Sequence, residues 1–256
     1  MKYMGSKSRI SKYIVPIIQD YIDSYNITTY LEPFVGGANV IDKIKCENKY
    51  GFDKNKYLIS LLKRVQTGQK LYSEVPKELY DKARSAFNKG DTSAFEDWEI
   101  GNIGFLASYN GRWFDDGYAK TGYEKTRNGL RLRNYYQEAK NNLLVQAPNL
   151  GGIYFSCCDY REVLNVLGSH SGMVIYCDPP YQNTKHYINA REFDYFVFWE
   201  TMRKWSKANI VLISEQEAPD DFVCIWEQQV SRSINSANKK RATEKLFIHK
   251  NRCQGL

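Results

Sequence analysis

The sequence predicts a doubly wound α/β fold with a mostly parallel sheet, an antiparallel edge pair and a helical insert. Before residue 60 and after residue 145, short apolar segments alternate with segments of helical periodicity, which is typical of a parallel sheet covered by helices. Between them the strand-like segments stop. Residues 1–60 and 146–256 are therefore predicted to form one domain, and residues 61–145 an inserted one.

The first region has the expected alternation of helix and strand. Its predicted helices cover 8–25, which contains Pro16, a segment beginning at Ala38, and 55–65. Its predicted strands are 29–34 and 49–53. The second of these strands ends in an acid, Asp53.

The insert is mostly helical, and the α/β alternation resumes after it. Helices are expected over 76–88, 95–108 and 134–144, whereas 109–129 is rich in Gly, Tyr and Arg, lacks a period and is expected to be irregular. Beyond the insert the expected strands are 153–157, 173–177, 209–214, 222–226 and 245–249, and the expected helices are 161–167 and 191–206. The final strands have no helix between them, which predicts an antiparallel edge pair.

Positive charge is concentrated in two segments. The chain has a net charge of +7, yet 231–252 alone holds seven Lys or Arg against Glu244, and 112–133 holds six against three acids. Clustered basic residues with interleaved aromatic residues suit a polyanion such as nucleic acid. Two solvated basic loops would give the same charge pattern.

Other classes of protein are disfavoured. The first residues have no apolar run typical of a signal peptide, and no stretch approaches the roughly 20 apolar residues that cross a bilayer. The six cysteines form no C-x-x-C pair and the three histidines are scattered, which predicts reduced cysteines and no metal site. We expect a cytoplasmic protein with no membrane partner.

The segment Asp178-Pro179-Pro180-Tyr181 carries the sharpest chemical signal. It follows an apolar strand, so the acid should lie at the carboxyl end of a parallel sheet, where such folds bind ligands. Two prolines fix the backbone and remove two N–H donors. The carboxylate of Asp178 and the carbonyl of Pro179 could each accept one hydrogen bond from an exocyclic adenine amine, and Tyr181 could stack on the base. A rigid turn with a buried tyrosine is the alternative interpretation.

A second signal is the turn Glu32-Pro33-Phe34-Val35-Gly36-Gly37 after the first strand. Glycines there allow a ligand to approach the backbone closely. The motif G-x-G-x-x-G is absent, which disfavours a dinucleotide cofactor. Asp53, at the end of the second strand, is placed to bind ribose hydroxyls, so turn and acid together are typical of a cofactor that contains a nucleoside.

The order of these motifs resembles the Dam-type (D12 class) DNA adenine methyltransferases. Tyr3-x-Gly5-x-Lys7 comes first, then the glycine turn, an insert, and Asp178-Pro179-Pro180-Tyr181. The resemblance covers nearly the whole chain and implies a Rossmann-like methyltransferase sheet, S-adenosylmethionine as cofactor, and an insert that recognises the DNA target. By the residues alone, a solvated cap at a helix start is the favoured interpretation of Lys7.

The resemblance also implies roles for individual residues. Asp178, Pro179, Pro180 and Tyr181 are the catalytic candidates. The cofactor-binding candidates are Tyr3, Gly5, Lys7, Pro33, Phe34, Gly36, Gly37, Asp53, Cys158, Asp159, Tyr160 and Asp178. Tyr109–Phe114 resembles the base-reading loop of the family. The DNA-binding candidates are Asn110, Arg112, Trp113, Lys120, Arg127, Lys239, Lys240 and Arg241.

These residues predict transfer of a methyl group from S-adenosylmethionine to N6 of an adenine flipped out of double-stranded DNA. The protein is expected to act as a monomer or weak dimer. Two alternatives remain open: an enzyme that methylates an RNA adenine or a protein amide, and a non-catalytic DNA-binding relative. The recognition sequence, and whether a restriction enzyme accompanies the protein, cannot be deduced from the residues.

Overall fold

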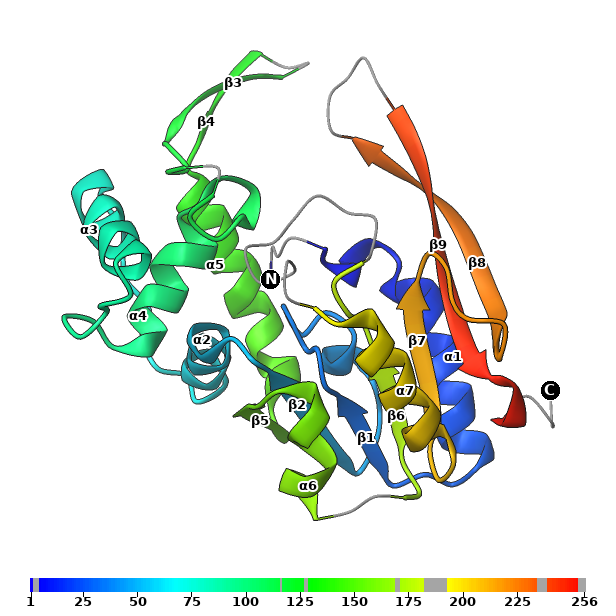
Figure 1. The fold of residues 1–256 in the computed structure, drawn as a ribbon. Helices are drawn as coiled ribbons and strands as arrows, with labels where there is room; N and C mark the ends of the chain where they lie inside the picture. The colour runs from blue at the N-terminus through cyan, green and yellow to red at the C-terminus, as the bar shows by residue number, and fades with distance from the viewer. Residues whose placement is uncertain are drawn as a thin grey trace. The chain divides into compact units, whose positions relative to one another are not determined.

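The computed structural model describes residues 1, 5–115, 117–126, 129–168, 171–181, 193–233 and 239–252 (Figure 1). The chain divides into two compact units. Unit 1 comprises 1–12, 35–43 and 53–157, and unit 2 comprises 13–34, 44–52 and 158–256.

A mixed sheet forms the centre of unit 2, with neighbouring strands in the order β2-β1-β6-β7-β9-β8. Strands β2, β1, β6 and β7 pair in parallel, and β9 pairs antiparallel with both β7 and β8. The mostly parallel sheet with an antiparallel edge pair is therefore confirmed. The strands are β1 (Thr29–Glu32), β2 (Asn48–Asp53), β6 (Val174–Cys177), β7 (Ile210–Glu215), β8 (Phe222–Ser233) and β9 (Lys239–His249).

Helices cover this sheet on both faces, as a doubly wound fold requires. Because side chains alternate along a strand, Leu31, Ile175 and Ile213 share one face and form a core with the helices α6 (Val163–Leu167) and α7 (Tyr195–Ser206). Figure 1 shows α7 and α1 (Ser11–Ser24) on opposite sides of the strands. The buried residues of α1 recur at helical spacing: Ile14, Ile18, Tyr21 and Ile22.

Unit 1 is mainly helical. Its helices are α2 (Lys56–Gln66), α3 (Lys77–Asn88), α4 (Asp97–Gly101) and α5 (Tyr135–Gln146), and a π-helix, η3 (Asn102–Leu106), continues α4. It also holds the strand β5 (Ile153–Cys157), the hairpin β3 (Gly122–Thr126) with β4 (Gly129–Arg133), and the short helices η1 (Lys7–Arg9), η2 (Ile41–Lys43), η4 (Tyr109–Gly111) and η5 (Ala147–Leu150). Short helices η6 (Tyr160–Glu162) and η8 (Lys250–Arg252) belong to unit 2.

Three expectations about secondary structure were wrong. The helix predicted from Ala38 is reduced to η2, because Ala38 has a φ of 54°, which no α-helix accommodates. The stretch 109–129 was expected to be irregular, but it contains strand β3, which pairs antiparallel with β4. The last two strands are longer than expected, since β8 and β9 pair from Phe222↔His249 to Ser233↔Lys239.

No helix in the described ranges is long and apolar enough to span a membrane. The five cysteines in those ranges are not joined by disulfide bonds. Cys253 lies outside them. Nowhere in the described part of the chain do three His, Cys, Asp or Glu side chains gather in a way that could hold a metal ion.

Candidate active site

The catalytic candidates follow β6, which is central in the sheet and buried along its whole length. Asp178 comes directly after the last residue of β6, at the carboxyl ends of the parallel strands, and its side chain is half-buried. The Tyr195 hydroxyl on α7 donates a hydrogen bond of 2.7 Å to the carbonyl of Pro180. The diproline turn is thus anchored to the helix that covers the sheet.

Tyr181 points into unit 2 and is 9% exposed. Its hydroxyl donates a 2.7 Å hydrogen bond to Oε2 of Glu244 on β9. Burial raises the pKa of the Tyr181 phenol well above its usual value, and the negative charges of Asp178 and Glu244 raise it further. The phenol therefore stays protonated and remains a hydrogen-bond donor at neutral pH.

An aromatic cluster surrounds Phe34 in unit 2. The Phe34 ring lies 5.1 Å from Tyr160 and 6.0 Å from both Phe193 and Phe198, measured between ring centroids. Phe34 itself is half-buried, so part of its ring remains accessible. An aromatic ring that is partly accessible can stack on a purine.

Cys158 and Asp159 precede Tyr160 in the same unit. Asp159 accepts a hydrogen bond from the backbone N–H of Arg161 and forms an ion pair with the Arg161 guanidinium, Nε to Oδ1 2.8 Å. Asp159 caps η6 in this way. Its carboxylate is engaged locally, and the structure shows it as a capping residue.

The two glycines of the turn, Gly36 and Gly37, lie in unit 1, as does the acid predicted to bind ribose. The N–H of Gly36 donates to Oδ2 of Asp53 at 3.2 Å, and the N–H of Asn55 donates to Oδ1 at 2.9 Å. Burial raises the pKa of Asp53 above its usual value, while these two hydrogen bonds act in the opposite direction. The sequence prediction that associated the turn with Asp53 agrees with this contact.

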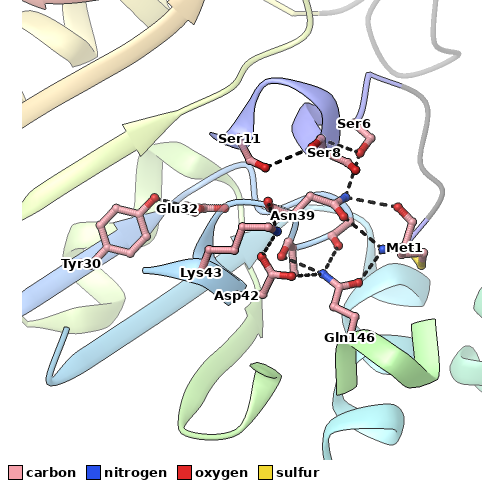
Figure 2. A network of polar contacts seen from close by, with 12 residues as sticks. Met1, Ser6, Ser8, Ser11, Tyr30, Glu32, Asn39, Asp42, Lys43 and Gln146 are labelled. Carbon is pink, nitrogen blue, oxygen red and sulfur yellow. Dashed lines mark hydrogen bonds and ion pairs between the residues drawn. The ribbon is translucent and has the colours of Figure 1, made fainter. Parts of the chain in front are cut away.

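A buried glutamine supports the turn from the end of α5 (Figure 2). The side-chain amide of Gln146 donates to the carbonyls of Gly37 and Ala38, at 3.1 and 2.9 Å, and to Oδ2 of Asp42 at 2.9 Å. Its oxygen accepts a hydrogen bond of 2.5 Å from the amino group of Met1. These hydrogen bonds satisfy buried carbonyls of the turn that no regular helix pairs.

The same network reaches the first motif. The side-chain amide of Asn39 donates to Oγ of Ser6 at 2.9 Å, and Oγ of Ser6 accepts from the N–H of Ser8, capping η1. Gly5 has a φ of 78°, and Lys7 in η1 is only 8% exposed. Lys7 is therefore not the solvated residue that one interpretation of the sequence allowed. Tyr3 lies outside the described residues.

Replacing Gln146 with Leu tests how much this network contributes to folding. The change keeps the volume but leaves the carbonyls of Gly37 and Ala38 buried without that donor. We expect the free energy of unfolding to fall by about 1–3 kcal/mol, measured by urea denaturation. Asn142→Leu, on the exposed side of the same helix, is the matched control and should change it by less than about 0.5 kcal/mol.

The loop with the base-reading candidates is closed by backbone hydrogen bonds in unit 1. The N–H of Tyr109 donates to the carbonyl of Gly117 at 3.0 Å, and that of Ala119 donates to Ala107 at 2.8 Å. Asn110, at a φ of 55°, is exposed on this loop, and Arg112 is half-exposed. Lys120, just after the loop, is exposed.

Trp113 has a packing role. Its ring contacts Phe105, Phe87 and Tyr57 with centroid distances of 4.3, 5.2 and 5.6 Å. A Cβ on Gly104 would lie 2.6 Å from the Trp113 ring, so glycine is what allows this contact. A DNA contact by Trp113 remains a prediction.

The remaining DNA-binding candidates are placed only in part. Arg127 lies outside the described residues. Lys239, Lys240 and Arg241 are in β9, where they pair with Ser233, Arg232 and Ser231 of β8, so the basic segment is the end of a β-ribbon and not a loop.

Two residues of this site were missed by the sequence analysis. Gln146 gave no signal, because glutamine is common on helix surfaces. Glu244 could have been noticed: it is the one acid among the basic residues of 231–252, and its alternation with Leu246 and Ile248 predicts that it faces the core.

Comparison with known proteins agrees with these motifs. The model of the D12 class N6 adenine-specific DNA methyltransferases matches residues 3–219. Among curated proteins, Type II methyltransferase M.MjaIII of Methanocaldococcus jannaschii is 26% identical over 76% of this chain and 74% of its own. A DNA adenine methylase of Vibrio cholerae is 29% identical over 59% of this chain and 55% of its own.

A third relative is much longer than the region it shares. Type II methyltransferase M.FokI of Planomicrobium okeanokoites is 23% identical over 71% of this chain but only 28% of its own length. The chain thus spans about a quarter of that relative and about half of the Vibrio protein. The match of the family model across most of the sequence shows that the chain belongs to the D12 class of N6 adenine-specific DNA methyltransferases.

Proposed function

We propose that this chain transfers the methyl group of S-adenosylmethionine to N6 of an adenine flipped out of double-stranded DNA, at a specific sequence. The observation that carries the proposal is Asp178 at the carboxyl end of the buried strand β6, followed by an anchored diproline turn and a buried tyrosine. We also propose that the protein acts in the cytoplasm.

The proposed methyl transfer depends on two hydrogen-bond acceptors that bind the amino group of the target adenine. The Asp178 carboxylate and the Pro179 carbonyl each accept one N–H of the adenine amino group, which directs the nitrogen lone pair toward the methyl group. Positive charge develops on N6 as the new bond forms, so a fixed carboxylate stabilises the transition state more than the ground state. The extra proton is then lost, since an alkylated arylammonium is acidic.

The residues present fit the cofactor. S-adenosylmethionine supplies an electrophilic methyl group on a sulfonium, and it carries an adenine and a ribose that need partners. The half-buried Phe34 ring offers a stacking surface for a purine. The Asp53 carboxylate retains lone pairs beyond its two backbone contacts and can accept from ribose hydroxyls.

The insert supplies the candidate DNA contacts. Asn110 and Arg112 lie on the closed loop 109–117, and these two residue types read adenine and guanine in the major groove. The β3–β4 hairpin adds a surface that is unusual for an isolated monomer, because Tyr123, Leu130 and Leu132 are 73%, 73% and 58% exposed. Arg131, on the same hairpin, is also exposed.

Phosphate contacts from the basic end of β9 predict a change in salt dependence. For Lys240→Ala we expect the plot of log affinity for duplex DNA against log salt to become shallower by about 0.9, with no change in the preferred sequence. Fluorescence anisotropy at several salt concentrations measures this. Lys207→Ala removes an exposed lysine elsewhere in unit 2 and should leave the slope unchanged. An unaltered slope for Lys240→Ala would remove it from the interface.

The acceptor class is tested with radiolabelled cofactor. Purified protein is given unmethylated genomic duplex DNA, structured RNA or a protein extract, and incorporation of the labelled methyl group is counted. We expect incorporation into DNA alone. Labelling of RNA or protein instead would replace the proposed substrate, and binding of DNA with no incorporation into any acceptor would indicate a non-catalytic relative.

A further inference from the structure

The tyrosine of the diproline motif is held at both ends. Its backbone follows the turn anchored by Tyr195, and its hydroxyl donates to Glu244, 63 residues further along the chain. Both side chains are almost fully buried, Tyr181 at 9% and Glu244 at 8% exposure. The Tyr181 side chain is therefore held in place at its hydroxyl as well as at its backbone.

Strand register explains how β9 delivers a carboxylate to this position. Cys177, the last residue of β6, lies opposite Ile213 of β7, and Ile213 lies opposite Phe247 of β9. Because β9 runs antiparallel to β7, the residues before Phe247 extend beyond the carboxyl end of β6, and those before Lys245 extend beyond that of β7. Glu244 therefore reaches the same edge of the sheet as Asp178 and Tyr181.

A buried carboxylate is costly unless a donor compensates for its lost hydration. An O–H donor to an ionised carboxylate forms a hydrogen bond about twice as strong as one between neutral groups. An uncharged acceptor would have satisfied the Tyr181 hydroxyl at lower cost. A glutamate at this position gives the Tyr181 hydroxyl a stronger acceptor than a neutral amide would.

We propose that Glu244 is a positioning residue for the methyl-transfer reaction, holding the ring of Tyr181 ready to stack on the flipped base. The inference rests on the proposed function, because it needs Tyr181 to receive a base. Glu244 is proposed to touch neither substrate nor cofactor, and to act on the reaction through the Tyr181 hydroxyl.

The same unit contains a matched control. The Tyr30 hydroxyl donates to Oε1 of Glu32 at 2.7 Å, both side chains are buried, and burial likewise raises the pKa of the Tyr30 phenol. The two tyrosines differ in position: Tyr30 lies within strand β1, whereas Tyr181 comes directly after the diproline turn that is proposed to receive the base. Tyr30→Phe therefore removes an equivalent hydrogen bond without touching the stacking residue.

A double-mutant cycle on turnover tests the proposal. Tyr181→Phe, Glu244→Gln and the double variant are assayed for kcat on duplex DNA, for cofactor affinity by calorimetry and for thermal stability. We expect each single change to lower kcat about fivefold to tenfold, and the double variant to be no slower than the slower single one, because both changes remove one interaction. Cofactor affinity should be unchanged. Tyr30→Phe should keep kcat within about twofold even where it lowers the melting temperature.

Each other outcome overturns the inference. Full kcat in Glu244→Gln would show that the contact is purely structural. Losses that multiply in the double variant would show that Glu244 acts by another route. Glu244→Gln keeps the size and shape of the side chain but removes the charge that strengthens its contact with Tyr181, so the fold is preserved for the measurement, and the melting temperature checks this. A wild-type protein that methylates no DNA would instead refute the proposed function itself, which keeps the two failures distinct.

Discussion

Replacing Asp178 with Asn is expected to lower turnover on DNA at least about 1,000-fold, because the group that stabilises the developing charge on N6 is lost. The amide keeps the shape of the carboxylate. It has no negative charge, and its NH₂ group would point a donor at an amine that needs acceptors. Methyl incorporation under single-turnover conditions measures the effect.

The control for Asp178 is Asp220→Asn, an exposed acid of unit 2. It should be as active as the wild type. The melting temperature of Asp178→Asn should lie close to that of the wild type, since the amide keeps the size and shape of this half-buried side chain. Substantial activity in a well-folded Asp178→Asn protein would remove Asp178 from the chemistry.

The second large effect is a loss of affinity for the cofactor, expected when Asp53 is replaced with Asn. Asp53→Asn keeps one oxygen, and so one of the two N–H contacts from Gly36 and Asn55, but it loses the charged acceptor proposed for the ribose hydroxyls. We expect the dissociation constant for S-adenosylmethionine to rise about 10- to 100-fold, which corresponds to about 1.5–3 kcal/mol for a hydrogen bond to a charged group. Isothermal titration calorimetry measures this directly.

Stability separates this binding effect from a folding defect. Burial raises the pKa of Asp53, so the folded protein binds its proton more tightly than the unfolded chain does. The contribution of Asp53 to stability therefore falls as pH rises from its usual pKa through the raised one, and at neutral pH its charge is a cost. Asp53→Asn should melt no lower than the wild type at pH 7. Asp81→Asn, an exposed acid of unit 1, should leave both affinity and melting unchanged.

The parts of the site that could be predicted from sequence are local ones. The Asp178-Pro179-Pro180-Tyr181 signal needed only the apolar strand before it, and the strand order confirmed its place at the carboxyl end of β6. The association of Gly36 with Asp53 followed from counting strand ends, and a hydrogen bond now joins them. Both inferences rest on the periodicity of the strands and on the residue types at their ends.

The supporting residues could not be predicted, because their partners are remote in sequence. Gln146 contacts Gly37 across 109 positions, and Glu244 contacts Tyr181 across 63. The helix wrongly predicted from Ala38 has another cause, since Ala38 has a φ of 54° and nothing about an alanine residue predicts that conformation. The β3–β4 hairpin was missed because β4 is exposed at all but its last residue. It therefore lacks the alternation of buried and exposed residues that marks a half-buried strand.

The central claim is best tested on unmethylated genomic DNA incubated with the purified protein and S-adenosylmethionine, followed by single-molecule sequencing for N6-methyladenine. The account predicts methylated adenines confined to one short motif, with none in the Asp178→Asn control. Absence of N6-methyladenine from DNA treated with a protein that binds the cofactor in calorimetry would contradict it.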